Sequence, residues 1–323
     1  MQNSPNAHVH VIVGAGPIGA GTARQLAAAG HRVKIVTRSG SGPSHDCIEL
    51  VRADAADQAL LASIAEGAHA IYNCANPQYH QWATDWPPLA ASLLGAAEAA
   101  SARLITMSNL YMYAPDSSPM RAGDPMDPPS KKGAIRAAMW SVALAAHEAG
   151  RVRVAEVRAS DFFGPGLGEN GHFGDRVLPK LLAGKSASFI GSSDVTHSWS
   201  YVDDVCATLV IAGTDDRALG RVWHVPTLEP MTVQELADEI SRAEGHGAAK
   251  VSQIPRVALK AAGLFSKVIR ELDEIRYQFT APFVLDGTET TAVFGLEPTP
   301  LAEQIDATIA SYQPGHASVG TAT

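Results

Sequence analysis

Three glycines with a fixed spacing are the first residues of this sequence with a recognisable chemical use. They lie in the stretch Gly14-Ala15-Gly16-Pro17-Ile18-Gly19. In such a stretch the first glycine permits a tight turn, the second lets the backbone approach a diphosphate, and the third lets the next helix pack closely. The helix N-terminus then places its positive end at the phosphates. We therefore expect a dinucleotide to contact Gly14, Gly16, Pro17, Ile18 and Gly19, and a turn without ligand is the alternative.

The residues after the second expected strand indicate which dinucleotide binds. A carboxylate at that place usually accepts a hydrogen bond from the ribose 2′-hydroxyl of NAD. This chain has Val-Thr-Arg-Ser at 36–39, and Arg38 could pair with the 2′-phosphate of NADP. We therefore expect NADP(H) rather than NAD(H), although Arg38 could also be a solvated loop residue. Asp54 is expected either to accept from the adenine amino group or to cap a helix.

The stretches around these residues predict the elements that must position them. Short β-branched runs alternate with alanine-rich runs of good helix formers through the first half of the chain. This alternation is typical of the Rossmann fold, an α/β architecture with a doubly wound parallel sheet. Strands are expected at 9–13, 32–36, 47–52, 70–74, 103–107 and 152–158, and helices at 18–29, 57–66, 87–100 and 131–149.

The second half mixes elements without a second independent pattern. Thr232 is followed three residues later by Glu235, which is the signature of a capping box at a helix start. A strand is expected at 222–225, and helices at 173–183, 254–264, 265–279 and 301–312. We expect a Rossmann core at 8–165, a small C-terminal substrate lobe at 166–313 with some segments returning to the core, and flexible tails at 1–7 and 314–323.

Composition and charge argue against several classes of protein. A net charge of −8 opposes binding to nucleic-acid phosphates. Three widely spaced cysteines argue against a disulfide framework or a zinc site. We find no signal peptide and no apolar run of about 18 residues, so no membrane contact and a cytoplasmic location are expected. The twelve histidines show no H-x-x-x-H or H-E-x-x-H spacing, so no metal is expected.

Three segments beyond the glycine loop share patterns with one known family. Residues 108–113 read Ser-Asn-Leu-Tyr-Met-Tyr, residues 158–165 read Arg-Ala-Ser-Asp-Phe-Phe-Gly-Pro, and residues 198–205 read Ser-Trp-Ser-Tyr-Val-Asp-Asp-Val. They resemble the Ser-Ser-x-x-Val-Tyr-Gly, Arg-x-x-Asn-Val-Tyr-Gly-Pro and Arg-Phe-Val-Tyr-Val-Asp-Asp-Val segments of the extended short-chain dehydrogenase/reductases, or NAD-dependent epimerase/dehydratase family. The resemblance covers residues 9–312 and also places Ala75, Lys132 and Ser160 at the cofactor.

The catalytic pattern of that family is missing here. The resemblance implies a serine or threonine after the fifth strand and a Tyr-x-x-x-Lys motif on the next helix, where tyrosine exchanges a proton and lysine lowers its pKa. The serine aligns with Asn109, and Tyr-x-x-x-Lys aligns with Lys132-Gly133-Ala134-Ile135-Arg136. Because none of the seven tyrosines has lysine four residues later, no shift of the alignment restores the motif.

A ketone reductase without that tyrosine needs another proton source. Hydride transfer requires only a positioned nicotinamide and a carbonyl, and proton delivery contributes about 10²–10⁴-fold. The open sources are Lys132 beside Arg136, Tyr111 or Tyr113 from the loop after the fifth strand, a water molecule, or a phenol of the substrate. Asn109 could donate a hydrogen bond to the carbonyl oxygen. Alternatively, both tyrosines could be core residues, and Lys132 and Arg136 could hold the cofactor or face solvent.

Aromatic residues dominate the candidate substrate contacts. They suit a flat or bulky apolar ligand better than a sugar nucleotide, although Arg176, Lys180 and Lys185 could bind a diphosphate. The expected contacts are Asn76, Tyr79, His80, Tyr111, Phe163, Phe173, His197 and Trp199.

Three functions are compatible with these features. The leading one is NADPH-dependent reduction of a ketone on an aromatic polyketide of the angucyclinone type, because some family members without the tyrosine act on such compounds. A non-catalytic NADP(H) sensor is the second. An epimerase or dehydratase of nucleotide sugars is the third, because that chemistry relies on the missing tyrosine. The helices at 87–100 and 131–149 occupy places where relatives dimerise, so a monomer or a homodimer is expected.

Overall fold

A single parallel sheet forms the centre of the molecule. The computed structural model describes residues 7–264 and 266–313. Seven strands lie in the order β10-β6-β5-β4-β1-β2-β3, and every pairing between neighbours is parallel. This order confirms the predicted Rossmann fold, and the strand expected at 222–225 joins the sheet as its seventh strand. The strands are β1 (Val9–Val13), β2 (Arg32–Thr37), β3 (Ile48–Arg52), β4 (Ala70–Asn73), β5 (Arg103–Ser108), β6 (Arg153–Arg158) and β10 (Val222–His224).

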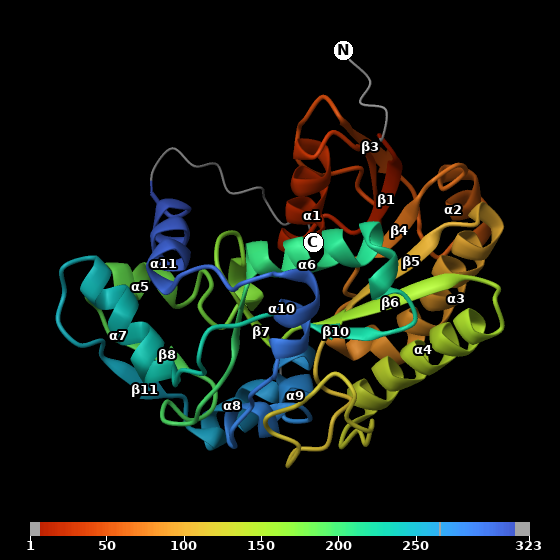
Figure 1. Cartoon of the computed structure of the whole chain (residues 1–323). Helices are drawn as coiled ribbons and strands as arrows, with labels where there is room; N and C mark the ends of the chain where they lie inside the picture. Colours follow the sequence, from red (N-terminus) through yellow and green to blue (C-terminus); the bar gives the residue numbers. More distant parts are fainter. Residues whose placement is uncertain (1–6, 265, 314–323) are drawn as a thin grey trace.

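Helices cover both faces of the sheet because its strands are apolar on both sides. Val11 and Val13 share one buried cluster with the helices α2 (Gln58–Ile64), α3 (Trp82–Ala100) and α4 (Lys131–Glu148). Ile12 points to the opposite face and packs with α1 (Pro17–Ala28) and α6 (Val202–Thr214). Such alternation is the two-residue period of a β-strand buried on both faces. In Figure 1, α2, α3 and α4 flank one side of the sheet.

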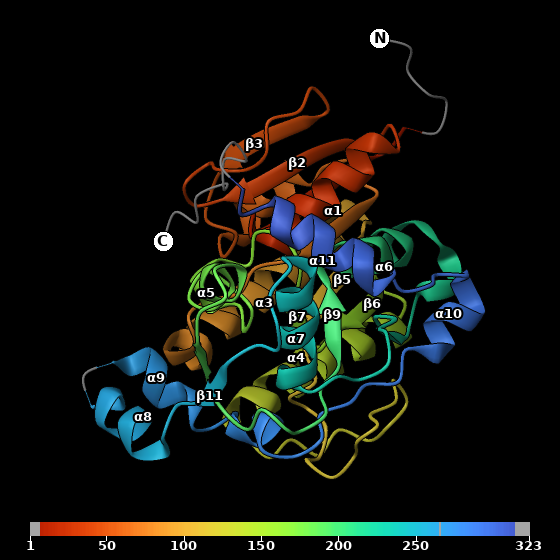
Figure 2. The same cartoon turned by 90° about the vertical axis from the view of Figure 1, so that its left-hand side faces the viewer.

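The remaining elements form a lobe beside the sheet. A third cluster of buried apolar residues joins α5 (Leu178–Leu182), α7 (Val233–Ala243) and α11 (Leu301–Ala310). Figure 1 shows α5, α7, β8 and β11 on the side away from α2 and α3, and Figure 2 shows β2 and β3 at the opposite end from α8 and α9. The other lobe elements are β7 (Asp161–Phe163), β8 (Ala187–Phe189), β9 (Trp199–Tyr201), β11 (Val251–Gln253) and α8 (Arg256–Gly263). Two late helices pack against the core instead: α9 (Lys267–Leu272) joins the cluster of α2, α3 and α4, and α10 (Thr288–Phe294) packs against Trp223 of β10.

Two predicted helices have the wrong length. The helix expected at 87–100 begins at Trp82 and contains Pro87 and Pro88 in its interior. Trp82 and Trp86 are 1% and 0% exposed, so their burial holds the first turns helical despite the two prolines. The helix expected at 173–183 covers only Leu178–Leu182.

The chain around residue 174 explains the second error. A Cβ on Gly174 would lie 2.0 Å from the carbonyl oxygen of Gly168, so the backbone packs against the preceding loop instead of coiling. The helix expected at 265–279 is also divided, into α9 and the short helix η4 (Arg276–Phe279), and residue 265 lies outside the described residues. The capping box is confirmed, because Thr232 and Glu235 bond each other's backbone N–H groups.

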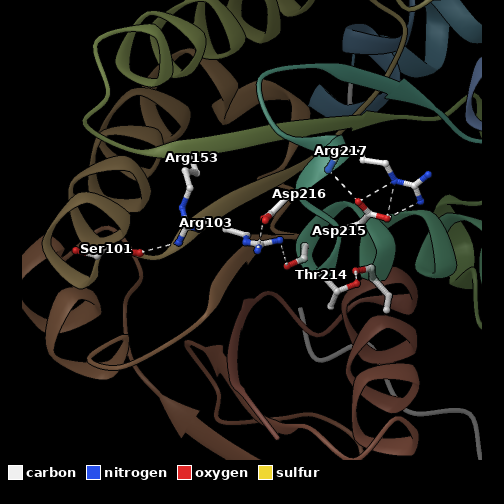
Figure 3. Close-up of polar contacts among 9 residues, drawn as sticks. Ser101, Arg103, Arg153, Thr214, Asp215, Asp216 and Arg217 are labelled. Atoms are coloured by element: carbon white, nitrogen blue, oxygen red, sulfur yellow. Dashed lines mark hydrogen bonds and ion pairs between the residues drawn. The ribbon is translucent and has the colours of Figure 1, made fainter. Parts of the chain in front are cut away.

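An arginine at the amino end of β5 ties the sheet to α6. Arg103 donates to the carbonyl oxygen of Gly213 at 3.2 Å and to Asp216 at 2.6 Å, and it is 5% exposed. Figure 3 shows this contact beside the Asp215–Arg217 pair. These contacts of Arg103 lie at the amino end of β5, whereas Asn109 follows its carboxyl end. They therefore stabilise the fold at the edge of the sheet away from the candidate site. No helix in the described part of the chain is long and apolar enough to cross a membrane.

Candidate active site

The glycine loop joins β1 to α1 at the carboxyl edge of the sheet. Gly14 has a φ of +102°, and a Cβ there would lie 2.7 Å from the carbonyl oxygen of Cys74. A Cβ on Gly19 would lie 2.1 Å from the carbonyl oxygen of Gly14. Among the described residues, nothing lies within 4 Å of a Cβ built on Gly16, which is the N-cap of α1. Two glycines are therefore required by the fold, and the third leaves space beside a helix N-terminus.

This geometry fits the diphosphate of a dinucleotide. The first N–H groups of α1 are free at its N-terminus, and Pro17 occupies the first turn, where no N–H is needed. A helix N-terminus beside open space is a suitable place for phosphate oxygens. Gly14, Gly16, Pro17, Ile18, Gly19 and Ala75 would hold the group there, as the sequence predicts, and Ala75 follows β4 directly after Cys74.

Arg38 lies exposed in the loop after β2. The neighbouring Arg52, at the end of β3, donates from Nε to the carbonyl oxygen of Arg38 at 3.2 Å. The hydroxyls of Ser39 and Ser41 lie 2.7 Å apart in the same loop. The Arg52 guanidinium and the hydroxyls of Ser39 and Ser41 thus lie in the loop that carries Arg38, where the 2′-substituent of an adenosine ribose is expected. Asp54 is exposed and accepts from the N–H of Ala56 at 3.0 Å.

Lys132 is buried in an ion-pair cluster at the start of α4. Its Nζ lies 2.5 Å from carboxylate oxygens of both Glu271 and Glu274, and its side chain is 3% exposed. Burial acts to raise the pKa of Glu274, but its hydrogen bonds to Lys132 hold that pKa below its ordinary value. Both carboxylates bind Nζ directly, so they fix the Lys132 side chain in an ion-pair cluster inside the protein.

Arg136, one turn further along α4, packs into the interface between α3 and α4. Its guanidinium lies 4.2 Å and 4.9 Å from the ring centroids of Trp86 and Trp82. One nitrogen donates to the carbonyl oxygen of Met107 at 3.3 Å, and burial lowers the pKa of Arg136 to about 10. These contacts are typical of a buried cation over aromatic rings, and they favour a structural role for Arg136.

The two tyrosines after β5 have different surroundings. Tyr113 is 1% exposed, and its hydroxyl lies 2.8 Å from Nε2 of His224 at the edge strand β10. The hydroxyl of Tyr111 lies 2.9 Å from that of Tyr79, and burial raises the pKa of both. Tyr113 is thus engaged away from Asn109, whereas Tyr79 and Tyr111 form a pair close to Lys132, whose Nζ lies 5.6 Å from the centroid of the Tyr79 ring.

The predicted substrate contacts fall into buried and accessible groups. Phe163 and Phe173 are 0% exposed in the core of the lobe, which favours a packing role. Trp199 lies in the same core and is 7% exposed. Asn76 is exposed after β4, and Tyr79 and His80 are half-buried in the short helix η1 (Tyr79–Gln81) that follows. The carboxylic amide of Asn109 is half-buried and accepts from the N–H of Tyr111 at 3.1 Å.

His197 lies in a polar contact that the sequence does not predict. Its Nε2 lies 2.8 Å from Oδ2 of Asp161 and 3.3 Å from Oγ of Ser160. Ser160 directly follows β6, so this group stands at the carboxyl edge of the sheet, as Asn109 does after β5. Burial acts to raise the pKa of Asp161, but its hydrogen bond and charge attraction to His197 hold that pKa below its ordinary value.

Three acidic residues of the site were missed from the sequence. Asp161 occupies the asparagine position of the Arg-x-x-Asn segment, so a signal was present in the quoted residues. Glu271 and Glu274 lie near the end of α9 and reach Lys132 through tertiary structure, for which no local pattern exists. Within the described residues, no group of three or more histidine, cysteine or acidic side chains is arranged to hold a metal ion.

Solved structures of similar fold carry nicotinamide dinucleotides. WbmG of Bordetella bronchiseptica, in complex with NAD, has a TM-score of 0.77 and 18% identity over 99% of both chains. DesIV, a dTDP-glucose 4,6-dehydratase from Streptomyces venezuelae with NAD and TYD bound, has a TM-score of 0.71 and 20% identity over 94% of this chain and 96% of that one. At such identities these structures show a common fold.

Sequence comparison identifies the family. A dTDP-glucose 4,6-dehydratase from an Actinoplanes species is 28% identical over 141 residues, which is 42% of each protein. The chain thus spans less than half the length of that relative. The model of the NAD dependent epimerase/dehydratase family matches residues 10–225, the glycine loop and all three downstream segments included. The protein therefore belongs to the NAD dependent epimerase/dehydratase family.

Proposed function

We propose that the protein reduces a ketone on a bulky aromatic molecule with NADPH, without the tyrosine acid of its family. When bound, the nicotinamide supplies the hydride that reaches the carbonyl carbon. The protein's own residues would hold the cofactor, orient the ketone and deliver a proton to its oxygen. The observation that carries the proposal is the Lys132–Glu271–Glu274 cluster, which stands at the tyrosine position of a chain whose glycine loop is intact.

That cluster argues against chemistry that must first remove a proton from a hydroxyl. Epimerases and dehydratases begin by oxidising an alcohol, which needs a base at this place. The Nζ of Lys132 is instead engaged by Glu271 and Glu274. Reduction of a ketone needs a proton donor instead, and the donor can stand elsewhere around the carbonyl oxygen.

The choice of NADPH is supported by the loop after β2. This loop contains Arg38, whose backbone carbonyl oxygen accepts from Arg52, and the hydroxyls of Ser39 and Ser41, whereas Val36 to Ser39 contain no carboxylate. A 2′-phosphate requires such charge-assisted donors, whereas a 2′-hydroxyl requires an acceptor. The related structures are complexes with NAD, so the preference is a proposal specific to this chain.

The aromatic substrate class is supported by the residues near the carboxyl edge. Among them Tyr79 is half-buried, and its hydroxyl bonds that of the buried Tyr111. Ser198 stands where the family segment has arginine, and its buried hydroxyl accepts from the N–H of Leu285 at 3.2 Å. A nucleotide diphosphate needs cationic partners, and this position offers none.

A nucleotide-sugar substrate is the second candidate, because a named relative acts as a dTDP-glucose 4,6-dehydratase and the solved DesIV structure has the same fold. One experiment separates the two. The protein is incubated with NADPH and either a panel of polycyclic aromatic ketones or dTDP-glucose and UDP-sugars. Oxidation of NADPH with a ketone supports our proposal. Conversion of a nucleotide sugar without net NADPH loss supports the second candidate, and tight cofactor binding without either reaction indicates a sensor.

A further inference from the structure

A cavity of about 230 Å³ lies between α8 and α9, on the side of α9 away from Lys132. The two helices pack against each other, as Figures 1 and 2 both show. Ile269 and Leu272 line the cavity, whereas Glu271 and Glu274 bind Lys132. The two sets are offset by two residues, which is about half a helical turn. The cavity is therefore separate from the ion-pair cluster of the candidate active site.

Apolar side chains form most of the surface of this cavity. They come from α8 and the turn after it (Leu259 and Leu264), from α9 (Ile269 and Leu272) and from Ile190, which follows β8. Leu264 is 78% exposed, and Ile190, Leu259 and Ile269 are half-buried. Apolar surface that stays in contact with water favours an apolar ligand, because binding removes that surface from water. Ligand pockets usually measure about 300–1,000 Å³, so this one suits the apolar part of a small molecule.

Positive side chains line the accessible edge of the same cavity. Arg256, Lys260, Arg270 and Arg276 contribute to its lining together with one carboxylate, that of Asp273. Arg276 lies 3.7 Å from Asp273, which leaves three cations. These three are exposed, and none of them forms an ion pair within the part of the chain that the structure describes. The chain as a whole has a net charge of −8, so this edge has the sign that attracts an anion.

We propose that the cavity binds a small amphipathic carboxylate, with its apolar part between α8 and α9 and its carboxylate among Arg256, Lys260 and Arg270. Planar guanidinium groups match the two oxygens of a carboxylate and form charge-assisted hydrogen bonds with it. A neutral apolar molecule leaves the cations without a partner. A small inorganic anion leaves the apolar surface in contact with water. An acyl chain or an aromatic ring that carries a carboxylate satisfies both parts of the site.

Calorimetric titration of the full chain with a series of carboxylates tests the two parts of the ligand separately. The ligands are acetate, butanoate, hexanoate, octanoate and 2-naphthoate, with octan-1-ol as the neutral counterpart of octanoate. We expect one octanoate per chain, and an affinity that rises about fourfold for each buried CH₂ until the cavity is filled. Octan-1-ol should bind about 10-fold more weakly than octanoate. Octanoate and 2-naphthoate distinguish an acyl chain from a ring, and tighter binding of either supports the proposal.

Two single variants test whether the carboxylate lies at the positive edge. Arg256→Gln removes a cation of α8, and Arg270→Gln removes one of α9. Both side chains are exposed, so we expect the fold to persist, and thermal unfolding checks this. Each variant should weaken octanoate binding about 10-fold and leave octan-1-ol binding unchanged. Arg32→Gln is the matched control, because it removes an exposed arginine on β2, at the opposite end of the molecule (Figure 2).

Several results would overturn the proposal. One is the absence of saturable carboxylate binding up to about 10 mM ligand. Another is acetate binding as tight as that of octanoate, because acetate does not need the apolar cavity. Octanoate binding that stays unchanged in Arg256→Gln and Arg270→Gln would place the carboxylate elsewhere. If Arg270→Gln does not fold, Arg256→Gln alone decides this point. Self-association in sedimentation experiments that both variants abolish, without carboxylate binding, would assign the surface to a second copy of the chain instead.

Discussion

At the ends of β1 and β2 the backbone leaves open space beside a helix N-terminus, whereas at the ends of β4, β5 and β6 charged and aromatic side chains fill the site. The first region depends on glycines whose missing Cβ atoms keep backbone segments in contact. The second has lost the family's tyrosine and lysine and contains Lys132 between two carboxylates and Arg136 over two indoles. Under the proposed function, cofactor binding and proton transfer are therefore separate properties of this fold.

The glycine loop gives the largest expected effect. Gly19→Ala places a Cβ 2.1 Å from the carbonyl oxygen of Gly14, so the strand and helix must separate. We expect a stability loss of about 2 kcal/mol and a loss of dinucleotide affinity of about 100-fold or more. Gly16→Ala should keep its stability and lose only affinity, because its Cβ would enter the diphosphate space. Gly247→Ala, with nothing within 4 Å among the described residues, is the control for denaturant unfolding and fluorescence titration.

Removal of Lys132 should affect stability more than chemistry. Lys132→Ala leaves two carboxylates, 28% and 26% exposed, without their cation, and we expect a loss of about 1–3 kcal/mol by urea unfolding. The pKa of Glu274 is held low in the wild type, so its stabilising contribution is present above the ordinary carboxyl pKa and is lost as pH falls. The variant should lack this dependence. The control is Lys131→Ala, an exposed neighbour. A large fall in kcat with unchanged stability would indicate instead that Lys132 takes part in the reaction.

Arg38→Ala tests whether the cofactor region prefers NADPH to NADH. Loss of one exposed charge-assisted contact should weaken NADPH binding about 10-fold and leave NADH binding unchanged. Arg32→Ala, at the opposite end of β2, is the matched control, because it is exposed and distant from the loop. Calorimetric titration with both cofactors measures the ratio. Equal losses for NADPH and NADH would refute the assignment of Arg38 to a 2′-phosphate.

Histidines at the amino ends of the strands should make the stability of the fold depend on pH, independently of catalysis. Burial lowers the pKa of His10 to about 3, and the rings of His8, His31 and His69 meet its ring edge-on with centroids within 6.5 Å. Because the unfolded histidine binds a proton near pH 6.5 and the folded one does not, stability falls as pH decreases below 6.5. His10→Gln should reduce the loss between pH 7 and 5 by about 2 kcal/mol in thermal or urea unfolding. His45→Gln, on an exposed loop, should not.

The predictable part of the molecule is the part governed by local pattern. The glycine spacing, the strand alternation and the capping box at Thr232 each depend on neighbours in sequence, and the structure confirms all three. The early start of α3 depends on burial of Trp82 and Trp86, which no local rule contains. The helix α6, which packs against α1, was not predicted.

The sequence predicts the catalytic region only as a departure from the motif of its family. The absence of Tyr-x-x-x-Lys is visible in the sequence, but its replacement is not, because Glu271 and Glu274 reach Lys132 across 139 and 142 residues of chain. The contact of Tyr113 with His224 spans 111 residues in the same way. Side chains that meet through such separations leave no periodic signal. The site residues therefore stay predictions for the experiments above.

Transfer of deuterium is the most direct test of the central claim, that this site carries out hydride transfer without the family tyrosine. NADPH deuterated at C4 on either face is incubated with the protein and a polycyclic aromatic ketone, and the product is examined by mass spectrometry. We expect one deuterium at the new carbinol carbon from one of the two labelled faces, with one NADP formed per alcohol. Cofactor binding without deuterium transfer to any ketone, or conversion of a nucleotide sugar with the label retained on the cofactor, would contradict the claim.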